Sequence, residues 1–419
     1  MYKIRIPYSD SIIKIAFFLF ISFTFFPKGV PFQPKLQEQG LEEIGESNII
    51  NQIINIVIFI LSLIAAIPKL DEIISFIKKE KFLFILISWS LISIFWSDFP
   101  LVTFKRWFQI FLIYFLIITY FSYYPISQAV RLIKTIIYPY IIITIFSCLL
   151  IQGALDPDFG SWRGLTPHKN TLGQFGVILS VLTLIIVSME TGRMKKIFSI
   201  TFFFLSVVIV LGTFSSTSYI ALFIFLTGTL LYWTKTKIFG RMGVHNSLFI
   251  YTFTTGIVIL IIVMIFVPEF TDFIQGIFGK SETFYDRGKL WLAMLWQASQ
   301  HPILGCGFQA FWTIENPQLL LLYQTFIWLP NQAHNGYIDL INEIGIVGLI
   351  LFILMIVKNI VRSFRYQILT PWLWFLILPL ISNVTESNFF RVGPVTPTFI
   401  ILSYLVLEKS LNNFRKEVL

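Results

Sequence analysis

The chain has 419 residues, of which 56% are hydrophobic and only 13% charged, and its mean hydropathy is +0.79. This composition excludes a water-soluble globular protein, because so few charged residues cannot cover a soluble fold. The net charge of +9 is spread over connecting segments, which argues against nucleic acid as a partner. The two cysteines, Cys148 and Cys306, indicate neither a disulfide framework nor a metal site.

Apolar runs of about 16–20 residues recur along the chain, each long enough to cross a hydrocarbon core of about 30 Å. Lipid offers the backbone no hydrogen-bond partners, so such spans are helices or barrel strands, and continuous apolarity favours helices. The first run ends FFPKG without a small-residue cleavage site, which favours a retained span. We expect an all-α polytopic membrane protein with about twelve transmembrane helices, at residues 11–27, 49–67, 82–97, 104–121, 135–152, 171–189, 197–212, 215–233, 248–267, 337–357, 370–387 and 394–408.

No stretch between these spans is long enough for a soluble domain, so residues 1–419 are expected to form a single integral-membrane domain. The longest connection, residues 268–336 between helices 9 and 10, is expected to be a large outer loop with a short interfacial helix. No repeat with a period of about 20–50 residues is visible, and the halves are not obviously related. An inverted-repeat transporter is therefore not indicated.

The basic residues predict the orientation of the spans. With the N-terminus in the cytoplasm, 21 of the 31 Lys and Arg residues fall on the inner side and 10 on the outer side. Every inner segment holds at least two of them, which is the positive-inside pattern. Both chain ends are therefore expected in the cytoplasm, and the outer loops carry the unusual polar segments WSDFP (96–100), SWRGLTPHKNTLGQ (161–174), FYDRGKLW (284–291), NQAHNGYIDLINE (331–343) and TESNFFR (385–391).

The second of these segments places Arg163, His168 and Lys169 just outside span 6. One interpretation is a cationic contact for a charged substrate, with His168 as a general base. The alternative is a capped helix start with flanking basic residues, and from this segment alone the alternative is favoured.

Residues 286–300 predict a short helix, with Asp286 as N-cap and Pro302 beyond its end. Arg287 and Lys289 would then lie in the first turn, where the helix N-terminus favours a phosphate-type anion. The alternative is an interfacial helix whose basic residues meet lipid headgroups. Spacing alone leaves both interpretations open.

His334 stands at the entry of span 10, beside a polar strip that includes Asn335 and Asp339. Imidazole is the side chain suited to take a proton from a hydroxyl near neutral pH. A single histidine is more often structural, but the neighbouring basic clusters on the same side favour function. Glu386 and Arg391, between the last two spans, are expected to form a local ion pair.

Several chemistry-bearing motifs are missing from the sequence. There is no Gly-rich P-loop, no paired-carboxylate motif in a loop and no Cys/His metal spacing. An energy-coupled pump and a metal-dependent nucleotide-sugar transferase both lose support, and we expect no cofactor and no metal site.

The histidine segment resembles a signature of the O-antigen ligase and polymerase superfamily of bacterial envelope glycan assembly. In that signature HN is followed by nine residues and G-x-x-G, as in His334-Asn335 followed by Gly345 and Gly348. The stretch around Arg287, with HPILGCGFQAFW (301–312) after it, is similar to the family's arginine helix followed by H-P-x-x-G-x-G.

Two further segments, WSDFP and WRGLTPHKNTLG (162–173), most resemble the exopolysaccharide-polymerase branch, and the resemblance spans about residues 96–390. One departure is visible at residues 214–219, which read FSSTSY where relatives often carry an arginine after a serine pair. No anion contact is expected there.

The resemblance implies a metal-independent, inverting glycosyltransferase at the outer face of the bacterial inner membrane. It would transfer a glycan from undecaprenyl diphosphate to a hydroxyl acceptor. His334 and Arg287 would be catalytic, with His334 taking the acceptor proton and Arg287 stabilising the leaving diphosphate. Substrate-binding roles would fall to Arg163, Lys169, Lys289, Asn335 and Asp339.

The acceptor separates a ligase, which would use lipid A–core, from a polymerase, which would use another lipid-linked repeat unit. The 161–174 segment slightly favours the polymerase, with a chain-length regulator as a candidate partner beside membrane lipid. The main rival is a transporter or flippase, in which outer polar residues line a path without chemistry. A transporter predicts polar residues on both sides of the membrane and at mid-membrane depth, whereas here they collect on one side. A third alternative, a purely structural subunit, is least favoured.

Overall fold

The computed structural model describes residues 6–27, 49–157, 160–238, 283–326, 330–365, 371–391 and 395–418. Across these ranges the regular elements are helices, and the only extended pairing is an isolated bridge between Leu155 and Trp162. The expected all-α fold is confirmed for this part of the chain. Its α-helices are α1 (Ser9–Phe25), α3 (Ile49–Ala66), α4 (Leu70–Glu80), α5 (Phe82–Ile92), α6 (Pro100–Tyr123), α7 (Ile126–Leu150), α8 (Lys169–Met189), α9 (Arg193–Gly212), α10 (Ser216–Ile238), α13 (Thr283–Gln300), α14 (Pro317–Thr325), α15 (Gly336–Arg365), α16 (Trp374–Ser382) and α17 (Thr396–Val418).

The expected spans coincide with these helices, except that the span at 248–267 lies outside the described residues. By length and composition, 7 helices of the described part can cross a membrane, and Phe82–Phe95 and Pro371–Ser382 are shorter apolar helices. The chain is therefore a polytopic membrane protein, while the count of twelve and the side on which each loop lies stay predictions.

A search for long apolar runs does not predict α4 or α14. In α4, Asp71 in the first turn and Lys79 in the last turn match the helix dipole, and the helix carries too many charges to be read as a span. α14 begins with Pro317 after Asn316, whose Oδ1 accepts a hydrogen bond from Gln318 N at 3.0 Å. Both helices are short, and they are stabilised by charges or caps at their ends. Neither contains a long apolar run by which it could have been predicted.

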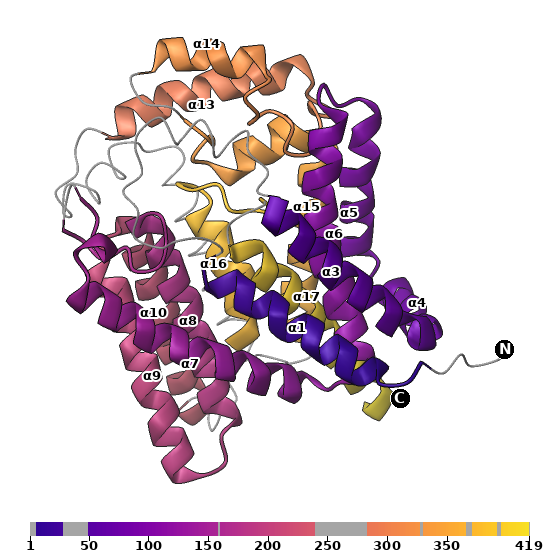
Figure 1. Cartoon of the computed structure of the whole chain (residues 1–419), viewed down its shortest axis with the longest axis vertical. Coiled ribbons are helices and arrows are strands. Elements are labelled where there is room, and N and C mark those ends of the chain that lie inside the picture. Colours follow the sequence, from indigo (N-terminus) through magenta and orange to yellow (C-terminus); the bar gives the residue numbers. More distant parts are fainter. Residues whose placement is uncertain are drawn as a thin grey trace.

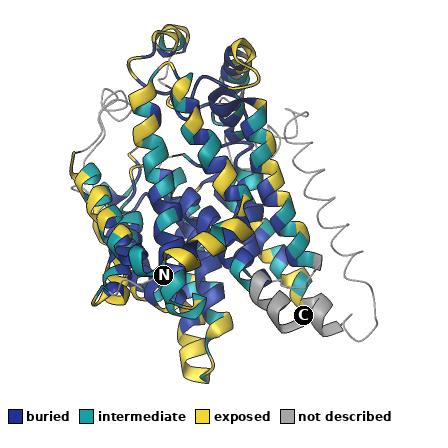
Figure 2. Ribbon diagram, turned by 90° about the vertical axis from the view of Figure 1, so that its right-hand side faces the viewer, coloured by how far each residue is buried: buried dark blue, intermediate teal, exposed yellow. Residues whose placement is uncertain are grey.

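Figure 1 shows two groups of helices, α7–α10 and α3–α6, with α16 and α17 between them. Residues 395–408, most of which belong to α17, are all buried, which makes this helix the centre of the bundle. Buried residues lie mainly inside the bundle and exposed ones outside it (Figure 2). Many exposed side chains are large and apolar, as expected for a surface in contact with lipid: Phe18, Phe104, Phe146, Phe204 and Phe223 are examples.

Helix ends that the charge pattern assigns to one side lie together in the structure. On the side assigned to the cytoplasm, Lys134 Nζ at the start of α7 lies 2.5 Å from Glu190 Oε1 at the end of α8. On the other side, Trp162 N donates to Gly212 O at 2.8 Å. α13 and α14 lie across that second end of the bundle (Figure 1). The candidate site residues therefore lie at this same end of the bundle.

Candidate active site

Helix α15 is broken at Gly345, where the backbone has φ 68° and ψ −176° instead of helical values. A break leaves backbone N–H and C=O groups without helical partners, and each buried group needs a replacement. The loop of residues 301–307 supplies these replacements. Cys306 N donates to Asn342 O at 2.9 Å, Gly307 N donates to Glu343 O at 2.9 Å, and Ile346 N donates to Pro302 O at 2.9 Å.

Gly345 admits this loop because it has no side chain. A Cβ at Gly345 would lie 2.0 Å from Ile303 O, and the left-handed φ disfavours other residues. The nearest neighbour of this glycine is therefore the backbone of a loop. Trp89 Nε1 and Trp96 Nε1 support the same contact by donating to Ile344 O at 3.1 Å and Leu304 O at 3.2 Å.

The N–H groups at the start of α15 are bonded by the chain itself. Asn335 is the N-cap, and its Oδ1 accepts from Tyr337 N at 3.1 Å and Ile338 N at 3.2 Å. Asn335 N donates to Ser387 Oγ at 3.0 Å, and Gly336 N donates to Asn383 O at 2.8 Å. Asn335, expected among the substrate-binding residues, therefore has its carboxamide oxygen engaged in capping.

His334 precedes this cap and lies outside the helix, with a left-handed φ of 50°. A non-glycine residue in this region carries a cost of about 1 kcal/mol, and such backbone strain clusters at functional sites. The imidazole is about one-fifth exposed, and its Nδ1 lies 3.8 Å from Glu386 Oε2 and 3.2 Å from Gln332 Nε2. His334 faces a polar environment, as predicted, but these neighbours come from loops rather than from its own helix.

Glu386 is a buried carboxylate among the basic groups singled out from the sequence. Burial acts to raise its pKa, but the nearby basic groups His334, Arg287 and His168 outweigh burial. The pKa of Glu386 therefore lies below its ordinary value of 4.5. The fold thus brings the Arg287 helix and both candidate histidines to one ionised carboxylate.

Arg287 is a half-buried residue of α13, and its NH1 donates to Thr385 O at 3.0 Å. This bond holds the guanidinium beside the 383–391 loop that carries Glu386. Because α13 extends from Thr283, Asp286 lies within the helix and is not its N-cap, which corrects the predicted helix start. Lys289 is exposed on α13 and lies about 200° around the helix axis from Arg287, so the two do not form one anion contact.

Arg163 and Lys169 are buried in the segment before and at the start of α8. Arg163 Nε donates to Gly153 O at 2.9 Å and its NH1 donates to Pro167 O at 3.3 Å. These bonds close the loop on itself. Lys169 is only 4% exposed, which is rare for a lysine.

His168 is the N-cap of α8. Its Nδ1 accepts a hydrogen bond from Asn170 N at 3.2 Å, and its Nε2 lies 4.0 Å from Asp156 Oδ2. A capped helix start is therefore present, with His168 rather than Asn170 or Thr171 as the cap. Because the Nδ1 lone pair is engaged in capping, His168 is the weaker of the two candidates for the base.

Asp339 is a buried residue of α15 that joins three segments. Its Oδ1 accepts from Trp312 Nε1 at 2.8 Å and its Oδ2 accepts from Ala333 N at 3.2 Å. Arg391 NH1 lies 4.0 Å from the same Oδ2. The expected ion pair between Arg391 and Glu386 is therefore wrong: Arg391 pairs with Asp339, and Glu386 pairs with His334.

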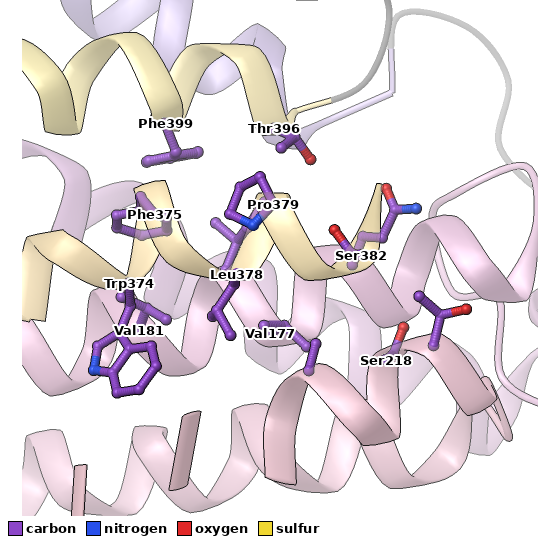
Figure 3. A pocket seen from close by; sticks show the side chains of 14 residues that line it. Val177, Val181, Ser218, Trp374, Phe375, Leu378, Pro379, Ser382, Thr396 and Phe399 are labelled. Atoms are coloured by element: carbon purple, nitrogen blue, oxygen red, sulfur yellow. The ribbon is translucent and has the colours of Figure 1, made fainter. Parts of the chain in front are cut away.

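A groove lies between α8, α10, α16 and α17 (Figure 3). The polar end adjoins the site, because Thr217 Oγ1 lies 3.3 Å from the Oγ1 of Thr385, whose carbonyl binds Arg287. The opposite end is apolar. The polar lining includes Gln174, Thr217, Ser218, Ser382 and Thr396, and the apolar lining includes Val181, Trp374, Phe375 and Phe399.

The 385–391 segment contacts three of the site residues, a role that was not predicted from the sequence. Thr385 holds Arg287, Glu386 faces His334, and Ser387 binds the backbone of Asn335. The available signal was a polar TESN sequence at the outer end of an apolar span, where polar groups often mark function.

Comparison with known proteins gives two matches. Residues 201–353, a segment that contains both Arg287 and His334, match the O-antigen ligase family. The exopolysaccharide production protein ExoQ of Rhizobium meliloti (strain 1021) is 33% identical over 90 residues, which cover 20% of this chain and 20% of that relative. The predicted resemblance to the O-antigen ligase and polymerase superfamily is confirmed by these two matches, although the alignment spans only a fifth of the relative's length.

Proposed function

We propose that this chain, which carries an O-antigen ligase segment at residues 201–353, is a membrane glycosyltransferase of the ligase and polymerase type. It transfers a glycan from undecaprenyl diphosphate to a hydroxyl acceptor at the periplasmic face of the bacterial inner membrane. The observation that carries the proposal is the convergence of Arg287 and His334 on the 383–391 loop, at the polar end of an apolar groove.

The proposed chemistry needs one base and one anion-binding group. The acceptor oxygen attacks the anomeric carbon of the donor sugar, and the bond between that carbon and the diphosphate oxygen breaks. The acceptor proton passes to His334, while Arg287 stabilises the charge that develops on the diphosphate. Because diphosphate is already a good leaving group, no acid is required, and attack from the face opposite the lipid inverts the anomeric centre.

The other predicted binding residues take supporting roles in this proposal. Lys169 adds buried positive charge at the start of α8, and Arg163 holds the loop before it. Asn335 and Asp339 fix the backbone on either side of His334 and the start of α15. Lys289 is exposed and is assigned to the diffuse attraction of an anionic headgroup rather than to a fixed contact.

The groove supports a donor that carries a lipid. Its apolar end suits an isoprenoid chain, and its polar end, beside Thr385, would leave the diphosphate within reach of Arg287. The similarity to an exopolysaccharide production protein favours a polymerase, in which the acceptor is another lipid-linked repeat unit, over a ligase to lipid A–core.

The test is to replace His334 and Arg287 singly with alanine and to analyse surface glycan together with the lipid-linked pool. Arg193→Ala is the matched control for Arg287→Ala, because Arg193 is an exposed arginine at the first residue of α9, outside the site. Loss of a polymerase leaves single repeat units, whereas loss of a ligase leaves long chains on the lipid carrier. Normal glycan in both site variants would contradict the assignment, and so would an equal defect in the control.

A further inference from the structure

We propose that Glu386 is a positioning residue for the base: it accepts the Nδ1–H of His334 and so makes Nε2 the nitrogen that takes the acceptor proton. This inference rests on the proposed function, in which His334 is the base. Glu386 acts through His334 and does not contact the substrate. It extends the candidate site beyond the residues predicted from the sequence, where Glu386 was expected only to pair with Arg391.

The first support is geometric. His334 Nδ1 and Glu386 Oε2 are 3.8 Å apart, and both side chains are largely shielded, at 19% and 6% exposure. The two loops that carry them are joined by backbone bonds, since Gly336 N donates to Glu386 O at 3.0 Å and Asn335 N donates to Ser387 Oγ at 3.0 Å. A small rotation of the imidazole closes the remaining gap, as catalytic hydrogen bonds tighten when substrate binds.

The second support is electrostatic. Three basic groups favour the ionised form of the carboxylate: His334 beside it, Arg287 on α13 and His168 at the start of α8. Together they hold the pKa of Glu386 below its ordinary value in spite of burial. An ionised carboxylate only accepts hydrogen bonds, so a neutral His334 bonded to it must carry its proton on Nδ1.

Gln332 competes for the same nitrogen. Its Nε2 lies 3.2 Å from His334 Nδ1, and its Oε1 accepts from Arg391 NH1 at 3.4 Å, which orients the amide. If Gln332 donates to Nδ1, the imidazole proton must lie on Nε2, and that nitrogen is no longer a base. Glu386 therefore selects the productive tautomer and Gln332 the unproductive one.

The contact with Glu386 also strengthens during the reaction. As the acceptor O–H bond breaks, its proton binds Nε2 and the ring becomes a cation with hydrogen on both nitrogens. Gln332 can no longer donate to Nδ1, whereas Glu386 remains ionised and stabilises the new charge. An interaction that is stronger in the transition state than in the ground state accelerates the step.

The experiment compares Glu386→Gln and Glu386→Asp with the unaltered full-length protein in detergent. The substrate is the lipid-linked oligosaccharide pool extracted from cells that lack this chain. For Glu386→Gln we expect kcat to fall about 100-fold, with donor KM changed by less than about threefold. The acid limb of the pH–rate profile should move to lower pH, because the imidazolium loses the carboxylate that stabilises it. Glu386→Asp should recover part of kcat.

An unchanged kcat in Glu386→Gln would overturn the inference. An equal fall in both Glu386 variants with an unshifted acid limb would overturn it too, because a merely structural carboxylate gives that pattern. His334→Ala keeps the two proposals apart. If His334→Ala is active, the proposed base is wrong; if it is inactive while Glu386→Gln is fully active, only the positioning role fails.

Discussion

The carbonyl oxygen of Ile303 occupies the space that a side chain on Gly345 would fill, 2.0 Å from the position of its Cβ. This contact joins the H-P-x-x-G-x-G segment to the glycines that follow the histidine signature. It fixes the loop after α13 against α15. Because α13 carries Arg287 and α15 begins just after His334, this contact positions the two residues relative to each other. These glycines therefore serve the geometry of the site rather than its chemistry.

Gly345→Ala is expected to destabilise the protein by roughly 2–5 kcal/mol, from a left-handed backbone and steric overlap with a loop that cannot retreat. The measurement is the melting temperature of the detergent-solubilised chain. Gly288→Ala is the matched control, because a Cβ there meets nothing within 4 Å and alanine favours the helix. Equal melting temperatures for Gly345→Ala and the unaltered chain would contradict the prediction.

Arg163→Ala and Arg287→Ala are expected to separate stability from chemistry. Arg163 binds the loop carbonyls of Gly153 and Pro167, so its loss should lower stability by about 1–3 kcal/mol and leave kcat of the folded protein near normal. Loss of Arg287 should lower kcat by about 10²–10³-fold. Thermal denaturation and turnover are measured on the same preparations. If the Arg163→Ala protein is folded and its kcat is as low as that of Arg287→Ala, Arg163 instead binds the diphosphate.

Ala221→Phe is expected to fill the groove between α8, α10 and α16, since Ala221 is one of its lining residues. Displacing about two methylene groups of an isoprenoid chain should weaken inhibition by added undecaprenyl diphosphate about tenfold. Leu230→Phe, on the exposed face of the same helix, is the control. Equal inhibition of the two variants would show that the lipid chain binds elsewhere.

Cysteine labelling tests the orientation of the chain in the membrane. Both native cysteines are buried, and burial also raises the pKa of the Cys306 thiol, so background labelling should be low. Ser299→Cys, exposed near the end of α13, should react with a membrane-impermeant maleimide added to spheroplasts. Met194→Cys, exposed at the start of α9, should react only after the membrane is opened. The reverse pattern would refute a periplasmic site.

Local patterns were sufficient for the membrane helices. α6 and α8 coincide with predicted spans because crossing lipid requires only a continuous run of apolar side chains, which the sequence displays directly. The same approach failed for α4 and α14, whose lengths are short and whose ends are set by charges and caps. It also failed for the break at Gly345, because a glycine in an apolar run does not reveal its φ.

Apolar length and the distribution of basic residues were enough to predict that Arg287, His334 and the other polar segments share one side of the membrane. Their partners could be found only from the folded chain: Thr385 for Arg287, Glu386 for His334, and Asp339 rather than Glu386 for Arg391. The difference is one of range. Hydrogen bonds and ion pairs require atoms within about 4 Å, and a sequence pattern gives the position of a residue along a helix but not its distance from a loop elsewhere in the chain.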